Sequence, residues 1–241
     1  MTRLGKLFSV AALLVTSAVF ASADTVFLGS YGTTNADVTP ALNPGFGNSA
    51  TVYAPTQSGS QRGIAQPTAG STNTYNLVRD SRWTGPLFAG GVASSYVSLD
   101  PGTSGAIIEP NGTYAYHSYF LATAAPVVTG YLTVLADDTV DAYLNGHQIV
   151  FNGEFAGNTY AVCSDVGPNC RTPLTVQLDG LVRTDGIAND LFFVVHQDAL
   201  ASTGLDFVGS VSSTPEPGSL LLLGTGLLGT AGTMLRRLRR S

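Results

Sequence analysis

The feature that most limits the possible folds is a series of short apolar or alternating runs, separated by turn residues, between residues 24 and 213. This part of the chain contains no amphipathic helical stretch of useful length. In the run TVDAYLNGHQIVF, every second residue from Val140 to Leu144 is apolar, and Asn145 and Gly146 follow. An Asn-Gly pair accepts the positive φ angles of a tight hairpin turn. The pattern therefore predicts an all-β sandwich.

The other strand candidates are spread over the same part of the chain. They are TVFLGSY (25–31), SYVSL (95–99), TYAYHSYFLAT (113–123), VVTGYLTVLA (127–136), LTVQL (174–178), DLFFVVHQ (190–197) and LDFVGSV (205–211). Residues 32–76 are rich in Gly, Pro, Ser, Thr, Asn and Gln, which predicts long loops around one or two strands. We therefore divide the sandwich, residues 24–213, into a loop-rich leader part (24–79) and a strand-rich remainder.

Three stretches together resemble the galactose-binding-like jelly roll of carbohydrate-binding modules. They are ADDTVDAYLNG, GIANDLFFVVHQ and GLDF, and the resemblance covers roughly residues 80–211. The segment Gly186–Leu191 departs from the family pattern by one extra residue between Gly and Asn. The resemblance implies a jelly-roll-like β-sandwich, a fold that supports many different activities.

The amino end has the three parts of an export signal. MTRLGK carries positive charge, the uncharged run LFSVAALLVTSAVF follows, and Ala21-Ser22-Ala23 has the small residues of a signal peptidase site. We predict a signal peptide over residues 1–23, with cleavage before Asp24. The uncharged run is short for a membrane span, which needs about 20 residues.

The charges are distributed unevenly along the chain. Six of the 11 basic residues lie at the two ends, whereas all 16 acidic residues lie between them. A body this acidic repels phosphate backbones, which argues against a nucleic-acid partner.

The two cysteines, Cys163 and Cys170, enclose the short turn-rich segment SDVGPN. An exported protein meets an oxidising compartment, so we predict a disulfide between them. A zinc site would need a second cysteine pair or a close histidine pair, and the sequence has neither.

The carboxyl end contains 18 consecutive uncharged residues, 218–235. A helix of that length spans about 27 Å, close to the thickness of a bilayer's hydrocarbon core. A basic cluster follows it: Arg236, Arg237, Arg239 and Arg240. The positive-inside rule places this cluster on the cytoplasmic side and the body of the protein outside. We therefore predict a single transmembrane helix over 218–235.

The tripeptide Pro215-Glu216-Pro217 precedes this helix. Together with the apolar helix and the terminal arginines, it resembles the PEP-CTERM sorting signal of Gram-negative bacteria. The resemblance covers residues 214–241. It implies recognition by an exosortase, a transient stay in the inner membrane, cleavage near the tripeptide, and delivery to the cell surface or the exopolysaccharide matrix. Pro215, Glu216 and Pro217 would then be recognition residues and not catalysts.

Asp137, Asp138 and Asp141 are the densest carboxylates of the chain. They are candidate ligands of a structural Ca²⁺, which prefers several oxygen atoms. A solvated turn that leads into a strand explains the same pattern. No other cofactor is predicted, because His117, His147 and His196 are far apart in sequence and fall on or beside predicted strands.

Four aromatic residues near predicted loops are candidates for binding a glycan: Trp83, Tyr96, Tyr143 and Tyr160. Aromatic faces suit the apolar C–H faces of sugar rings, whereas core packing is the alternative role for such side chains. The sequence thus favours a non-enzymatic surface or extracellular-matrix protein, associated with exopolysaccharide. The alternatives are a carbohydrate-binding module for a specific glycan and a surface glycan hydrolase that uses Asp or Glu residues.

Overall fold

The computed structural model describes residues 23–30, 47–54, 72–99, 112–125, 127–152, 163–197 and 203–214, and isolated positions from 226 to 238. The chain divides into two compact units. One unit contains residues 25–124 and 128–212, and the other contains residues 1–24, 125–127 and 213–241. The sandwich described below belongs to the first unit, apart from the outer ends of a few strands.

Thirteen strands form among the described residues. They are β1 (Asp24–Gly29), β2 (Gly47–Ala54), β3 (Thr72–Asn76), β4 (Phe88–Ala89), β5 (Val92–Ala93), β6 (Val97–Ser98), β7 (Gly112–Phe120), β8 (Val127–Asp137), β9 (Thr139–Leu144), β10 (His147–Val150), β11 (Leu174–Gln177), β12 (Asn189–Gln197) and β13 (Gly204–Thr214). The predicted strands are therefore present, although the segment 95–99 is paired only at Val97–Ser98.

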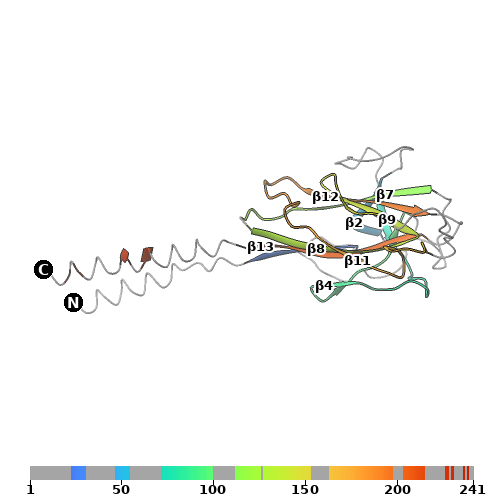
Figure 1. The fold of residues 1–241 in the computed structure, drawn as a ribbon, viewed down its shortest axis with the longest axis horizontal. Helices are drawn as coiled ribbons and strands as arrows, with labels where there is room; N and C mark the ends of the chain where they lie inside the picture. The colour runs from blue at the N-terminus through green and yellow to red at the C-terminus, as the bar shows by residue number, and fades with distance from the viewer. Residues whose placement is uncertain are drawn as a thin grey trace. The chain divides into compact units, whose positions relative to one another are not determined.

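The strands fold into two main layers. The hydrogen-bonded order is β10-β9-β12-β7-β2-β3-β6-β13-β8-β11, with β1 paired to β13. β9, β12, β7 and β2 lie on one side of the sandwich, and β13, β8 and β11 lie on the other (Figure 1). Chain neighbours β7 and β8, β8 and β9, and β12 and β13 therefore lie in opposite layers, as in a jelly roll. This confirms the predicted all-β sandwich.

The main core lies between these layers, where the apolar residues of alternating strand positions meet. Phe193 of β12 and Phe207 of β13 face each other with ring centroids 4.6 Å apart. Both side chains are fully buried, as are Leu132 and Leu191 in the same cluster. Alternation on β12 and β13 thus assigns every second residue to this core and turns the residues between them outward.

The β9–β10 hairpin forms at the predicted position. Its turn residues Asn145 and Gly146 have φ angles of 52° and 83°. Both angles are positive, as a type I′ turn requires. The Asn145 side chain also donates a hydrogen bond to the carbonyl oxygen of Leu181, at 2.9 Å, which ties the turn to a neighbouring loop.

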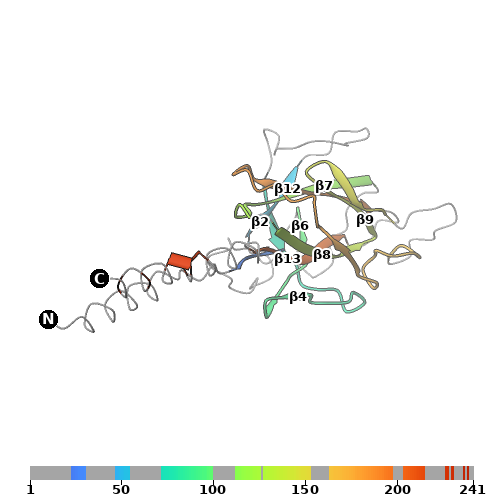
Figure 2. The same cartoon turned by 60° about the vertical axis from the view of Figure 1, so that its left-hand side comes forward.

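A third layer covers the outer face of β8 and β13. It consists of residues 77–96, here named the covering segment, and includes the small β4–β5 sheet. Figure 2 shows β4 beside β13 and β8, on the side away from β12 and β7. Ala89 packs against Val208 of β13, and Trp83 packs against Leu135 of β8. The outer face of β8 and β13 is therefore covered by protein around Leu135 and Val208.

The predicted Cys163–Cys170 disulfide is present, with the two Cα atoms 5.6 Å apart. Both cysteines pack beside Trp83 and Tyr96 under the covering segment. Among the described residues, no helix is both long and apolar enough to cross a membrane. The signal peptide, the tripeptide 215–217 and most of the predicted transmembrane helix lie outside the described residues.

Candidate functional site

The aromatic candidates do not form a sugar-binding surface. Trp83 and Tyr96 are each 2% exposed and Tyr143 is 7% exposed, so none offers a ring face to a ligand. Trp83 and Tyr96 pack against each other beneath the covering segment, with ring centroids 4.4 Å apart. Tyr143 packs on Phe192 on the outer face of the other layer. The prediction of a glycan platform from these three rings is therefore wrong, and Tyr160 lies outside the described residues.

Asp137 and Asp138 are buried beneath the same segment. Both are 0% exposed, and Asp137 Oδ2 accepts a hydrogen bond from Trp83 Nε1 at 2.6 Å. Burial, and then the neighbouring charge of Asp138, raise the pKa of Asp137 to about 9. The raised pKa favours the neutral form of Asp137, which suits a carboxyl group that is hydrogen-bonded inside the core.

Asp141 points elsewhere and binds protein donors instead of a metal. Its carboxylate accepts hydrogen bonds from Gln148, from the amide and side chain of Asn152, and from His196. Burial opposes ionisation, but these donors outweigh it and lower the pKa of Asp141. Among the described residues, Asp137, Asp138 and Asp141 do not form a cluster of ligand atoms such as a candidate calcium site requires.

One group of three ligand-type residues comes together among the described residues: Asp137, Cys163 and Cys170, with ligand atoms within 4.8 Å. The two cysteines are joined in the disulfide. Thiolates are the metal-binding form of cysteine, so this cluster does not offer a metal site in the oxidised protein.

Two histidine–aspartate pairs connect neighbouring strands on the outer face of β7, β12 and β9. His117 Nδ1 lies 2.8 Å from Asp190 Oδ1, and His196 Nε2 lies 3.0 Å from Asp141 Oδ2. His117 is 1% exposed, while His147 is an exposed residue at the start of β10. The pairs link three strands diagonally, which agrees with the expectation that these histidines are strand residues.

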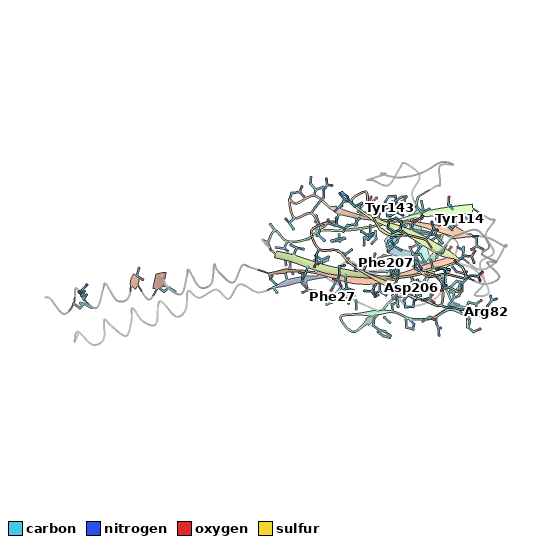
Figure 3. All side chains as sticks on the ribbon, viewed as in Figure 1. Phe27, Arg82, Tyr114, Tyr143, Asp206 and Phe207 are labelled. Carbon is cyan, nitrogen blue, oxygen red and sulfur yellow. A yellow bond between two sulfur atoms is a disulfide. The ribbon has the colours of Figure 1, made fainter. Side chains whose placement is uncertain are left out.

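The strongest candidate for a binding site is a polar pocket under the covering segment. Along β13, Leu205 and Phe207 enter the main core, and Asp206 turns to the opposite face. Figure 3 shows Phe207 on the side toward β12 and Asp206 on the side toward β4. A cavity of about 110 Å³ opens there, and its lining residues are Leu77, Arg79, Pro86, Ser94, Ser95, Tyr96 and Asp206.

The carboxyl group of Asp206 is only partly hydrogen-bonded. Oδ1 accepts a hydrogen bond from Ser30 Oγ at 3.2 Å, whereas Oδ2 has no donor within hydrogen-bond distance in the part of the chain that the structure describes. Burial raises the pKa of Asp206 to about 6, although Ser94, Ser30, the Leu87 amide and the Arg79 charge oppose that shift. Asp206 is therefore mostly an anion above pH 6, and this anion is fully buried.

Arg79 supplies the opposite charge on the same lining. Its Nη1 donates a hydrogen bond to the carbonyl oxygen of Trp83, which fixes the position of the guanidinium. Ser94 Oγ accepts a hydrogen bond from the Leu87 amide at 3.1 Å, so it is held in place as well. The pocket lining therefore combines the exposed Arg79, the buried Asp206 and the hydroxyl-bearing residues Ser94, Ser95 and Tyr96 with apolar walls.

Sequence reasoning did not select Asp206 or Arg79. One signal was present, because Asp206 is a carboxylate inside the apolar strand LDFVGSV, and a buried polar residue is more informative than a buried apolar one. The contribution of Arg79 could not be read in this way, because the covering segment carries it from a distant part of the sequence.

Comparison with known proteins assigns the carboxyl end. Residues 213–240 match the model of the PEP-CTERM protein-sorting motif. The chain carries a PEP-CTERM sorting signal. This confirms the resemblance seen in the sequence, and the signal implies an exported protein that is anchored at its carboxyl end and processed by an exosortase.

The described sandwich has distant similarity to solved structures. An FMN-binding beta-glucuronidase from Facaelibacterium prausnitzii L2-6 is 12% identical, with a TM-score of 0.36; the match covers 78% of this chain and 23% of the glucuronidase. The CBM36-1 domain of a multidomain xylanase from the hindgut metagenome of Trinervitermes trinervoides is 14% identical, with a TM-score of 0.24 and coverage of 56% and 89%. No curated protein matches the sequence.

Proposed function

We propose that this PEP-CTERM protein is a non-enzymatic component of the cell surface or extracellular matrix, and that its sandwich associates with exopolysaccharide. The observation that carries the proposal is the sorting motif at residues 213–240. An exosortase would recognise Pro215, Glu216 and Pro217 and release the sandwich from its anchor. A disulfide-linked sandwich suits an oxidising environment outside the cytoplasm.

The burial of Asp137 and Asp138, the adjacent carboxyl groups, argues against their use as a hydrolytic pair. A glycan hydrolase places two carboxyl groups about 5–10 Å apart on either side of the bond that it cleaves. Asp137 and Asp138 are adjacent but fully buried, so a polysaccharide cannot lie between them. Asp206 is the one carboxylate that lines the polar pocket. This arrangement supports a binding role for the sandwich.

Cosedimentation with exopolysaccharide tests the proposal. The protein released from the surface of producing cells is mixed with exopolysaccharide purified from the same cells and centrifuged, with dextran as a matched neutral polymer. We expect saturable pelleting with the exopolysaccharide at physiological salt. Equal pelleting with both polymers, or release of reducing sugar during incubation, would contradict a specific and non-catalytic association.

A further inference from the structure

We propose that residues 163–172, here named the disulfide loop, form a redox-controlled clasp that fastens the covering segment to the sandwich. With Cys163 and Cys170 oxidised, the segment stays closed over β8 and β13. With both cysteines reduced, the segment opens while the two main layers remain folded. This device is independent of the proposed association with exopolysaccharide, because it controls the fold and involves no glycan.

The covering segment has few backbone attachments to the rest of the protein. The amides of Leu77 and Ser94 donate to carbonyl oxygens within the segment, and β4 and β5 pair with each other. Among the described residues, one backbone hydrogen bond outside the strand ladders joins the segment to another part of the chain. It runs from the Thr84 amide to the carbonyl oxygen of Cys170, at 2.8 Å. The rest of the attachment is through side chains that contact β8 and β13.

The disulfide loop adds side-chain contacts at the same place. Thr84 Oγ1 donates to the carbonyl oxygen of Arg171 at 2.9 Å, and the Tyr96 hydroxyl lies 3.4 Å from the carbonyl oxygen of Cys170. The rings of Trp83 and Tyr96 pack against both cysteines in one buried cluster. The loop therefore holds the middle and the end of the covering segment together.

The other side of the loop is attached to the sandwich. The Ser164 amide donates to the carbonyl oxygen of Asp138 at 3.2 Å. Thr139 Oγ1, at the start of β9, donates to the carbonyl oxygen of Pro168 at 2.6 Å, and Thr139 also forms an isolated β-bridge with Asn169. The loop thus lies between the covering segment and the sandwich and is bonded to each of them.

The disulfide keeps the loop in the shape that makes these contacts. It joins the ends of the loop, with the two Cα atoms 5.6 Å apart. Asn169 supports the interior, because its side chain donates to the carbonyl oxygen of Ser164 and accepts from the amides of Arg171 and Thr172. A disulfide restricts the conformations of the loop that it closes. Without it, the carbonyl groups of Cys170 and Arg171 lose their fixed positions beneath the segment.

Closing the clasp is a two-electron oxidation by a disulfide of an exchange partner. The thiolate of one cysteine attacks the partner's disulfide and forms a mixed disulfide. The thiolate of the second cysteine then displaces the partner's sulfur, which forms the Cys163–Cys170 bond and leaves the partner as a dithiol. The two cysteines lose two electrons and two protons, and the partner gains them. Disulfides persist outside the cytoplasm and are rare inside it, so export would close the clasp.

The closed segment in turn protects the disulfide. Cys163 is 7% exposed and Cys170 is 0% exposed in the oxidised protein. Attack by an external thiolate requires access to a sulfur atom, so the segment must open before the bond can be reduced. The disulfide and the covering segment therefore stabilise each other.

The peptide bond between Arg82 and Trp83 reports whether the segment is open. The Arg82 side chain is 47% exposed, but Trp83 is 2% exposed, so trypsin must wait for a local opening before it can cleave here. Cleavage of a transiently opened region follows the population of the open form. Arg183 is an exposed arginine between β11 and β12, and its cleavage serves as the reference in the same digest.

Limited trypsin digestion of the full chain in detergent, followed by mass spectrometry, tests the proposal. One sample is oxidised, a second is reduced in urea and returned to buffer with dithiothreitol, and a third is then reoxidised with glutathione disulfide. Relative to Arg183, we expect cleavage at Arg82 to be about tenfold faster or more in the reduced sample. Reoxidation should restore the slow rate. Equal rates in the oxidised and reduced samples would overturn the proposal.

Variants separate the clasp from a general loss of stability. Replacing both cysteines by serine should accelerate cleavage at Arg82 as reduction does, while amide hydrogen exchange in β7 and β12 stays slow. Thr84→Val keeps the disulfide but removes the hydroxyl donor, and it should accelerate the same cleavage by about fivefold.

Leu191→Ala is the matched control. It opens a cavity in the main core, and Leu191 pairs with Leu144, at the end of β12 away from Thr139. It therefore lowers overall stability without touching the disulfide loop. Cleavage at Arg82 that rises as much in Leu191→Ala as in the double serine variant, or loss of slow exchange in β7 and β12 of the latter, would overturn the proposal.

Discussion

Replacing Asp206 by asparagine should stabilise the protein at neutral pH, because burial destabilises the ionised form of the Asp206 carboxyl group. Burial raises the pKa of Asp206 from 3.8 to about 6. A carboxyl group with a raised folded-state pKa contributes its stability at low pH, and that contribution disappears as the pH rises through about 6. The shift corresponds to about 3 kcal/mol of unfolding free energy.

Urea unfolding at pH 4 and pH 7.5 measures this effect, and Trp83 provides the signal because it is the only tryptophan and is 2% exposed. Wild type and Asp206→Asn should have nearly equal unfolding free energies at pH 4. At pH 7.5 the variant should be more stable by up to about 3 kcal/mol. Asparagine keeps the size of the side chain and an acceptor oxygen for Ser30.

An Asp80→Asn variant provides the opposite control. The side-chain hydrogen bond from Arg82 lowers the pKa of Asp80 to about 2, so removing this carboxylate should slightly destabilise the protein at pH 7.5. The loss should stay below about 1 kcal/mol, because the pair lies at the surface. The reasoning is refuted if Asp206→Asn is less stable than wild type at pH 7.5, since the ionised carboxylate would then be favourable where it lies.

Three further substitutions test the sandwich itself, each by urea unfolding. Gly209→Ala should destabilise the protein by about 2 kcal/mol or more, because an added Cβ would lie 2.3 Å from the Tyr131 carbonyl oxygen. An unchanged urea midpoint would show that the backbones of β8 and β13 are not so close at this position. Asp141→Asn should lower the free energy of unfolding by about 2 kcal/mol at pH 7. The pKa of Asp141 is lowered in the folded state, so its carboxylate stabilises the fold at neutral pH and the stabilisation is lost as the pH falls toward 3. A difference between variant and wild type that stays constant with pH would contradict this. Replacing Cys163 and Cys170 by serine should cost about 2 kcal/mol for so short a loop, and two alkylatable thiols in the unreduced protein would disprove the disulfide.

The strands could be predicted because their information is local. Alternation from Val140 to Leu144, followed by Asn145-Gly146, predicted β9, the turn and β10, and the structure has all three. The disulfide was also predictable, because export and a seven-residue separation are both visible in the sequence. The sorting signal was the most readable feature, since all of its parts occur in one continuous stretch.

The candidate site could not be predicted because it depends on the covering segment, whose packing against β8 and β13 leaves no periodic pattern in the sequence. The covering segment has short strands and many turn residues, so its aromatic residues were interpreted as exposed loop residues. Packing against β8 and β13 instead buries Trp83 and Tyr96. The same packing brings Arg79 to Asp206, which is more than a hundred residues away in the chain. Contacts of this kind follow from tertiary structure and not from periodicity or spacing.

The most direct test of the whole account is the fate of a chain with alanines at Pro215, Glu216 and Pro217, expressed in a Gram-negative host that has an exosortase. Cell fractions are separated, and the mass of the protein in each fraction is measured, with Arg79→Gln as a control outside the motif. Wild type and the control should reach the surface as a shortened species, while the triple variant should stay full length in the inner membrane. Normal surface delivery of the triple variant would contradict it.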